Sequence, residues 1–296
     1  MTDYRIIDIS DDPARVSVKY EQLVIKRDGQ EAAAPLSEIA AVVVSNPQVT
    51  YTHNALSGLA EAGAALVVCD SKHLPAGMML PLVGHFVQSE RFSRQSNASA
   101  PTRKQIWKQI VKAKVEAQGK LLKELHGKDQ GLIALSRRVK SGDSENIEAQ
   151  ASRRYWPALF GDKKFRRDRT REDQNRHLNY GYAVLRAIVA RAICGAGLHP
   201  SLGVHHHNRY DAFCLADDLM EPYRPLVDKA VANWTKDNDP KTELDKHAKQ
   251  ALLGPLTRKY PVDGEERSLF DAASRMAGSL AKTFEGKTKD LVIPEV

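Results

Sequence analysis

Two patterns of apolar residues divide this chain. Up to about residue 80 the apolar positions fall in short runs, and residues 15–20 alternate apolar with polar side chains, as a half-buried strand does. Residues 39–44 and 64–69 are apolar throughout, which indicates strands covered on both faces. Residues 52–62 between them have helical spacing. The first part of the chain is therefore predicted to be rich in strands, with one short helix.

From residue 102 onward the spacing of apolar residues is helical. One long helix is predicted over residues 102–125, where apolar residues recur every three or four positions with lysines between them. Further helices are predicted at about 129–140, 145–159, 174–194, 217–235, 241–253 and 267–284. Residues 88–101 are polar and read as a linker. The predicted fold is α+β, with a small β-rich N-terminal domain (1–87), the linker (88–101) and a larger all-α catalytic domain (102–296).

Composition narrows the class of protein. The 296 residues carry a formal net charge of +7, which favours phosphate-rich partners. No apolar run is long enough to cross a membrane and the N-terminus lacks the pattern of a signal peptide, so we expect a cytoplasmic protein. Three widely separated cysteines argue against disulfides. P-loop, dinucleotide-binding and nucleophile-elbow motifs are absent from the sequence, so ATP-driven and redox chemistry have no support.

A cluster of histidines and carboxylates is the first candidate for chemistry. His205, His206 and His207 precede Asp218 and Glu221, whose spacing of three places both carboxylates on one face of a helix. A mixed nitrogen and oxygen site of this kind suits Mn²⁺ or Mg²⁺ better than structural zinc. Two alternatives stay open. Asp218 and Glu221 could form a capping box at a helix start, and the histidines could be a pH-sensitive surface patch.

Glu148 is a further candidate, on the helix predicted over residues 145–159. Asp143 or Ser144 is expected to cap that helix. The alternative is a solvated glutamate that pairs with Ser152 or Arg153.

A basic segment follows the Glu148 helix. Six of the nine residues from 163 to 171 are Lys or Arg, and two arginines, a tyrosine and a tryptophan precede them. Basic groups interleaved with aromatic rings suit binding to a phosphate backbone and stacking on exposed bases. The candidate DNA-binding residues are Arg153, Arg154, Lys163, Lys164, Arg166, Arg167 and Arg224. The alternative is a flexible basic loop without a ligand.

A third pattern suggests a different activity. Arg171 and His177 lie near the start of a predicted helix, at a spacing similar to that of metal-independent ribonucleases of the HEPN type. An Arg and a His at such a spacing also occur by chance. This activity is kept as an alternative.

Several segments resemble one known family nearly from end to end. They are VVCDSKHLPAGMMLPL (67–82), NIEAQASRRYWPALFG (146–161), HLNYGYAVLRAIVARAI (177–193), GLHPSLGVHHHN (197–208) and LADDLMEPYRPLVD (215–228). The chain resembles the CRISPR-associated endonuclease/integrase of spacer acquisition, in the variant that accompanies type II systems. The resemblance implies a small β-rich N-terminal domain and a larger helical catalytic domain.

The resemblance also implies roles for particular residues. The metal ligands of the family, and with them its catalytic residues, fall on Glu148, His206 and Glu221, with Asp218 as a supporting carboxylate and His205 as the second choice of imidazole. The implied cofactor is Mg²⁺ or Mn²⁺. The implied reaction inserts short foreign DNA fragments into a CRISPR repeat array by transesterification, in antiviral defence.

Partners follow from the same resemblance. They are double-stranded DNA, a second copy of the chain in a homodimer that the N-terminal domain is expected to form, and a small CRISPR-associated adaptation protein. The alternative from another class is a non-catalytic subunit that organises DNA.

Overall fold

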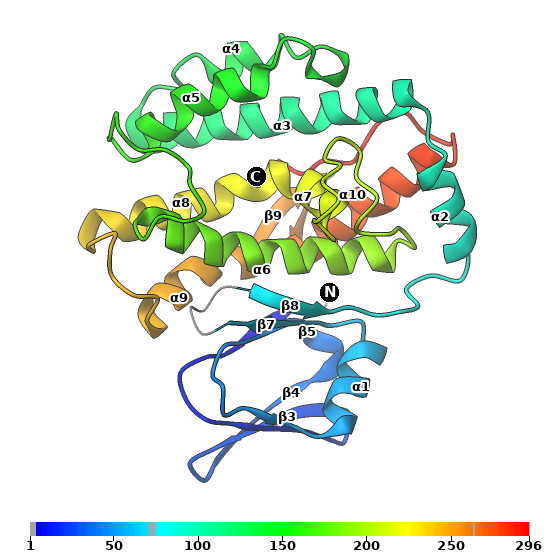
Figure 1. The fold of residues 1–296 in the computed structure, drawn as a ribbon, viewed down its shortest axis with the longest axis vertical. Helices are drawn as coiled ribbons and strands as arrows, with labels where there is room; N and C mark the ends of the chain where they lie inside the picture. Colours follow the sequence, from blue (N-terminus) through cyan, green and yellow to red (C-terminus); the bar gives the residue numbers. More distant parts are fainter. Residues whose placement is uncertain (1–3, 71–74, 263, 296) are drawn as a thin grey trace.

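The computed structural model describes residues 4–70, 75–262 and 264–295, and within them a strand-rich part and a larger helical part lie one against the other (Figure 1). The strand-rich part forms two four-stranded sheets and one helix. Its elements are β1 (Arg5–Ile9), β2 (Arg15–Lys19), β3 (Gln22–Arg27), β4 (Gln30–Pro35), the short 3-10 helix η1 (Leu36–Glu38), β5 (Ile39–Val44), β6 (Thr50–Tyr51), α1 (His53–Glu61), β7 (Ala65–Cys69) and β8 (Pro75–Met79). This arrangement confirms the predicted β-rich start of the chain. Residues 71–74 of the segment 67–82 lie outside the described residues.

The sheet β1-β5-β7-β8 joins the two parts. Strands β1, β5 and β7 are parallel, and β5 is buried at every position. Its side chains alternate between two hydrophobic clusters. Ala41 and Val43 pack into the core of the helical part, and Val42 and Val44 pack into that of the strand-rich part. The prediction that residues 39–44 form a strand covered on both faces is confirmed.

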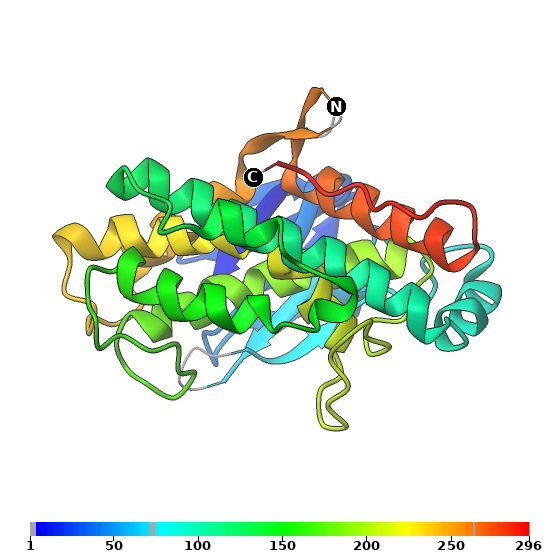
Figure 2. The same cartoon turned by 90° about the horizontal axis from the view of Figure 1, so that it is seen from above.

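The helical part stacks its helices in layers above this sheet (Figures 1 and 2). The helix α6 lies next to the sheet, α7 and α8 follow, and α3 with α4 and α5 forms the layer farthest from the strands. The bounds are α2 (Gln88–Ser96), α3 (Ala100–His126), α4 (Leu132–Ser136), η2 (Ser141–Asp143), α5 (Ile147–Leu159), α6 (Gln174–Gly195), α7 (Cys214–Met220), η3 (Glu221–Tyr223), α8 (Arg224–Asp237), α9 (Lys246–Leu253), η4 (Gly254–Thr257), β9 (Lys259–Val262), β10 (Glu265–Ser268) and α10 (Leu269–Phe284). Across the described residues, none of these helices combines the length and the apolar character that crossing a membrane requires.

The predicted linker at residues 88–101 is wrong as local structure. Gln88–Ser96 form helix α2, and α3 already begins at Ala100. The helix α2 is fixed by polar contacts, which an apolar pattern does not reveal. The buried amide of Gln95 donates to the carbonyl oxygens of His199 and Leu202 and accepts from the backbone N–H of His199. The division into domains at 1–87 and 102–296 stays a prediction.

Two other predictions about the helical part need correction. The helix expected over 217–235 is interrupted, because Pro222 and Pro225 open the new segments η3 and α8. The helix expected over 129–140 is only the five residues of α4. A small antiparallel hairpin, β9 with β10, adds two strands to a part that is otherwise helical.

Candidate functional site

The first turn of α5 presents Glu148. The carboxylate of Asp143 accepts from the backbone N–H of Ile147 at 2.8 Å and from that of Glu148 at 3.0 Å. It therefore satisfies two of the N–H groups that a helix start leaves open. Of the two residues predicted to cap this helix, Asp143 supplies the capping carboxylate, although the N-cap position itself is Asn146. Glu148 itself pairs with neither Ser152 nor Arg153 in the structure; its partner is Lys114.

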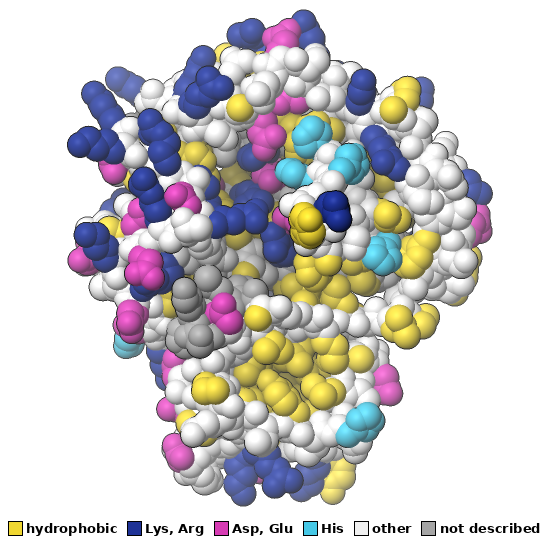
Figure 3. Space-filling view, in the orientation of Figure 1, with side chains coloured by type: hydrophobic (Ala, Val, Ile, Leu, Met, Phe, Trp, Pro, Cys, Tyr) yellow, Lys and Arg dark blue, Asp and Glu magenta, His cyan; other side chains and the backbone are white. Residues whose placement is uncertain are grey.

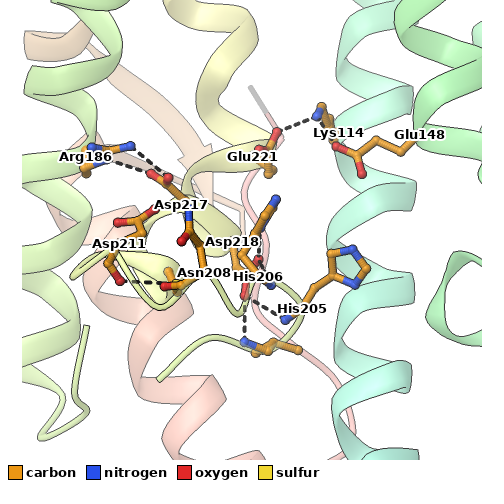
Figure 4. Close-up of polar contacts among 12 residues, drawn as sticks. Lys114, Glu148, Arg186, His205, His206, Asn208, Asp211, Asp217, Asp218 and Glu221 are labelled. Atoms are coloured by element: carbon orange, nitrogen blue, oxygen red, sulfur yellow. Dashed lines mark hydrogen bonds and ion pairs between the residues drawn. The ribbon is translucent and has the colours of Figure 1, made fainter. Parts of the chain in front are cut away.

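Lys114 connects two of the candidate residues. Its Nζ lies 2.6 Å from Oε1 of Glu148 and 2.6 Å from Oε2 of Glu221 (Figure 4). Burial alone would lower the pKa of Lys114, but the carboxylates of Glu221 and Glu148 outweigh it and leave the pKa above its ordinary value. Two carboxylates 73 positions apart in the sequence are thus gathered around one ammonium group.

Glu221 has a cation on each side. In addition to Lys114, the Nε of Arg224 lies 3.0 Å from its Oε1. Burial would raise the pKa of Glu221, but Arg224 and Lys114 hold it below the ordinary value, so this buried carboxyl is ionised. Arg224 lies over the ring of Tyr182, with 4.5 Å from the guanidinium carbon to the ring centroid. Arg224 is therefore held in a buried ion pair, and its contact with DNA stays a prediction.

Asp218 lies inside α7 and therefore does not cap a helix start, so the capping-box interpretation is wrong. It is fully buried and gathers the loop that carries the histidines. Its Oδ2 accepts from the backbone N–H of Val204 at 2.6 Å and of His205 at 2.9 Å. Its Oδ1 lies 3.3 Å from the backbone N of His206 and 2.6 Å from Nδ1 of the His206 ring. One carboxylate thus sets both the path of the loop and the orientation of one imidazole.

The hydrogen bond to Asp218 decides which nitrogen of His206 is free. A carboxylate only accepts, so Nδ1 of His206 carries the proton and the neutral ring has its lone pair on Nε2. This hydrogen bond raises the pKa of His206 above its ordinary value, although partial burial opposes it. The carboxylates of Glu221 and Glu148 act on the ring in the same direction.

The other two histidines differ from His206. The ring of His205 is stacked on Trp107, with 4.2 Å between the centroids and 2° between the planes, and burial lowers its pKa. His207 is exposed. Only His206 of the three has a ring nitrogen held by a carboxylate, which agrees with its choice over His205 as the candidate ligand.

Gly203 allows the histidine loop to approach α7. A Cβ at this position would collide with the carbonyl oxygen of His206 and lie 3.0 Å from the Cβ of Cys214 and 3.1 Å from Oδ2 of Asp218. The neighbouring carboxylate, Asp217, fixes α7 from its other side through a bidentate pair with Arg186, at 2.6 and 2.8 Å.

The described residues do not bring a complete set of metal ligands together. Across residues 4–70, 75–262 and 264–295, the structure forms no group of three or more His, Cys, Asp or Glu side chains close enough to hold a metal ion. Glu148 and Glu221 meet at Lys114, and the ring of His206 is turned with Nδ1 to Asp218.

A cavity of about 790 Å³ opens beside Glu221 and Lys114. Side chains of both predicted kinds line it, basic and aromatic. They include Lys114, Arg153, Lys163, Arg166, Arg167, Arg224, Trp156, Phe165 and Tyr182, and the acid Glu221 lies among them. Figure 3 shows histidines at the edge of a hollow that Lys and Arg side chains border. The candidates Arg154 and Lys164 are not among the residues that line the cavity.

The sequence profile of the family described as CRISPR associated protein Cas1 matches residues 7–262. The chain belongs to the Cas1 family. It is 37% identical over 286 residues to the CRISPR-associated endonuclease Cas1 of Neisseria meningitidis serogroup C (strain 8013), a match that covers 95% of this chain and 93% of that protein. The resemblance inferred from the sequence is confirmed.

Solved structures share the Cas1 fold. A casposase bound to an integration product superposes with a TM-score of 0.80 at 21% identity and covers 97% of this chain and 92% of that chain. A CAS1 protein from Thermotoga maritima gives 0.76 at 17%, covering 96% and 98%. The Cas6-RT-Cas1–Cas2 complex gives 0.75 at 19%, covering all of this chain and 37% of that chain. These likenesses confirm the predicted β-rich and helical architecture.

The geometry does not support a metal-independent ribonuclease based on Arg171 and His177. His177 is fully buried in α6, and burial lowers its pKa. Arg171 is exposed, and its Nε lies 3.6 Å from a carboxylate oxygen of Asp168. A histidine that no substrate reaches does not act as a general acid or base.

Lys114 is the residue of this Cas1-family site that the sequence pattern did not identify. In the sequence it is one of the lysines between the apolar positions of the helix predicted over residues 102–125. It lies four residues after Ile110 and three after Val111, on the buried face of α3. A lysine on an apolar stripe is rarely buried without a partner, and that was the available signal.

Proposed function

We propose that this chain is a divalent-metal-dependent DNA endonuclease and integrase that inserts short foreign DNA fragments into a CRISPR repeat array by transesterification. The observation that carries the proposal is the pair of carboxylates, Glu148 and Glu221, gathered around one cationic nitrogen, together with His206, whose Nδ1 is held by Asp218. Membership of the Cas1 family supports the same activity, since its relative in Neisseria meningitidis is named an endonuclease.

The donor set fits Mg²⁺ or Mn²⁺. The two carboxylates already have a positive charge between them, because Nζ of Lys114 lies 2.6 Å from an oxygen of each. Glu148, Glu221 and the Nε2 of His206 would hold the ion, and hard oxygen ligands with one imidazole are typical of these metals. A bound divalent ion would supply charge stabilisation at a phosphodiester and a lower pKa for an attacking hydroxyl.

The protein's own residues bind and orient the DNA. Arg153, Lys163 and Arg166 face the cavity beside the carboxylates and would contact phosphates. Arg167 is fixed on the same wall, because its guanidinium donates to the side-chain oxygens of Asn175 at 2.9 Å and Asn179 at 2.7 Å. A guanidinium already held in place loses little conformational entropy when it binds a phosphate.

Aromatic rings of the same cavity offer a second kind of contact. Trp156, Phe165 and Tyr182 line it next to the basic side chains. Phe165 and Tyr182 are buried, and the guanidinium groups of Arg224 and Arg167 lie over the Tyr182 ring. Trp156 is partly exposed and is therefore the ring proposed to stack on an unpaired base near the reacting end.

The experiment is strand joining on a supercoiled plasmid that carries a CRISPR repeat, with Mn²⁺, with Mg²⁺ and with EDTA. We expect Glu148→Gln, His206→Ala and Glu221→Gln to lose joining and to keep duplex binding, measured by fluorescence anisotropy. Glu145→Gln is the matched control, because Glu145 pairs with Lys140 and Arg138 outside the cavity. Full joining in EDTA, or wild-type joining by the three variants, would show that the assignment is wrong.

The second candidate, a non-catalytic subunit that organises DNA, has one observation in its favour. The ion pairs of Lys114 with the buried Glu221 and the partly exposed Glu148 would by themselves account for both carboxylates as structural groups. In that case DNA binding persists, but the wild-type chain joins no strands with either metal.

Partners belong to the same proposal. Binding of double-stranded DNA is supported by the basic cavity, and a small CRISPR-associated partner by the similarity to the Cas6-RT-Cas1–Cas2 complex. Homodimer formation through the strand-rich part rests on the family resemblance. Light scattering on the full chain is the suitable test, because removal of residues 1–85 would uncover core contacts of the helical part such as those of Ala41 and Val43.

A further inference from the structure

Lys114 lies where a cation shared by Glu148 and Glu221 would lie. Its side chain is 9% exposed, and its Nζ is 2.6 Å from an oxygen of each carboxylate. Oxygen ligands bind Mg²⁺ or Ca²⁺ at about 2.0–2.6 Å, so an ion that bridges the same two oxygens needs nearly the same space. The ammonium and a bridging divalent ion therefore exclude each other by volume as well as by charge.

Glu148 and Glu221 also need a cation when no metal is bound. Two ionised carboxylates that meet in a largely buried place repel each other strongly unless a positive charge lies between them. Arg224 neutralises Glu221 only from its other oxygen, Oε1. Among the described residues, Lys114 is the cation that pairs with both acids (Figure 4).

Lys114 also borders the basic cavity, together with Lys163 and Arg166. An ammonium group that leaves the carboxylates therefore has a space beside it in which a DNA phosphate would be a new partner. Without such a phosphate, the released ammonium group would lie near Arg153, Arg166 and Arg167, and repulsion between these positive charges would disfavour its release.

We propose that Lys114 is the resident counter-cation of this site, which holds Glu148 and Glu221 together in the free protein and moves to a DNA phosphate when a divalent ion takes its place. Lys114 is in this way a positioning residue that couples metal binding to DNA binding. The inference rests on the proposed function, because it requires that the two carboxylates bind a metal. By linkage, DNA strengthens metal binding by the same factor by which metal strengthens DNA binding.

Titration with Mn²⁺, followed by the EPR signal of the free ion, tests this coupling in the full-length chain with and without a short DNA duplex. Lys114→Met keeps a side chain of similar length and removes the charge. We expect it to bind Mn²⁺ at least ~10-fold more tightly than the wild type when DNA is absent, because no ammonium competes for the carboxylates. We expect the duplex to tighten Mn²⁺ binding by the wild type and to leave the variant's affinity nearly unchanged.

Two variants and one labelling experiment complete the test. Lys112→Met, on the exposed side of the same helix, is expected to behave as the wild type. Lys114→Arg keeps the charge and is expected to gain no Mn²⁺ affinity. Should Lys114→Met fail to fold, acetylation of lysines in the wild type, measured by mass spectrometry, gives the answer. Mn²⁺ with duplex DNA is expected to change the labelling rate of Lys114 and not that of Lys112.

The outcomes separate the two proposals. Unchanged or weaker Mn²⁺ binding by Lys114→Met, or a Lys114 labelling rate that ignores Mn²⁺, overturns the role of Lys114. If the wild type binds no Mn²⁺, or if Glu148→Gln and Glu221→Gln bind it as the wild type does, the proposed metal site itself fails.

Discussion

Replacement of Asp218 by Asn tests how the candidate site is held together. The carboxylate of Asp218 accepts from four N–H groups, two at each oxygen. An amide of the same shape has one oxygen, so its NH₂ must face two of those donors. The lower-cost arrangement keeps the oxygen on Val204 and His205, where the contacts are 2.6 and 2.9 Å, and turns the NH₂ toward His206.

In that arrangement the ring of His206 has to change its tautomer. Its Nδ1 can accept from the new NH₂ only without a proton, and the proton then sits on Nε2. The lone pair at Nε2 is lost, and with it the atom that would bind a metal. The backbone N–H of His206, 3.3 Å from Oδ1 in the wild type, is left without an acceptor. The loss of charge-assisted hydrogen bonds, with a part-buried N–H group left unpaired, is expected to lower the free energy of unfolding by about 2 kcal/mol, or roughly 4–8 °C in Tm.

The assay is NMR of the chain labelled with ¹⁵N-histidine, which distinguishes the two tautomers of His206, together with thermal unfolding and Mn²⁺ titration. We expect Asp218→Asn to show the proton on Nε2, a lower Tm and weaker Mn²⁺ binding. Asp217→Asn is the matched control on the same helix. It loses the bidentate pair with Arg186 and some stability, and it is expected to keep the tautomer of His206. If Asp218→Asn keeps the proton on Nδ1, or unfolds at the wild-type temperature, the reasoning is refuted.

Three further substitutions have expected outcomes. Gly203→Ala places a Cβ against the carbonyl oxygen of His206, so we expect a loss of strand joining and a lower Tm. Gly278 has open space around it, so the control Gly278→Ala should keep strand joining and Tm at or above the wild-type values. Equal behaviour of the two variants would contradict the close approach at Gly203. Burial raises the pKa of Asp228 from 3.8 to about 6, so between these pH values the folded chain keeps a proton that the unfolded chain releases. The resulting contribution to stability is complete at low pH and is lost as the pH rises from 3.8 to about 6. Relative to Asp228→Asn, the free energy of unfolding of the wild type should therefore fall across that window, and a constant difference would argue against the shift. His177→Leu should join strands as the wild type does, and RNA cleavage in EDTA that this variant loses would restore the ribonuclease alternative.

The spacing of apolar residues was sufficient to predict the helices and strands that bury apolar side chains. The six apolar residues of β5 predicted a strand covered on both faces, and the alternation of Ala41 and Val43 with Val42 and Val44 shows why. Helical spacing likewise predicted a helix over residues 174–194, and α6 spans Gln174–Gly195. The burial of apolar surface stabilises these elements, and the periodic spacing of apolar residues in the sequence directly reflects that burial.

Elements held by polar contacts were not visible in the same way. The helix α2 buries Gln95 rather than an apolar stripe, and the strands β9 and β10 have charged residues at half of their positions. The sequence assigns Asp218 only a supporting role, because its function as a backbone acceptor has no sequence signature. A side chain that accepts from three successive backbone N–H groups can be recognised only once the path of residues 204–206 is known.

Lys114 shows what the pattern of charge along a helix can indicate about the site. A charged residue on the buried face of a long helix must meet an opposite charge, since an isolated ammonium in that position is too costly. Its position between Ile110 and Gln118 on α3 therefore requires carboxylates from other segments to reach the same point. Glu148 and Glu221, selected from motifs, are the two that do so. The lysine is thus an independent reason to place those acids together, derived from the cost of burying charge and not from resemblance.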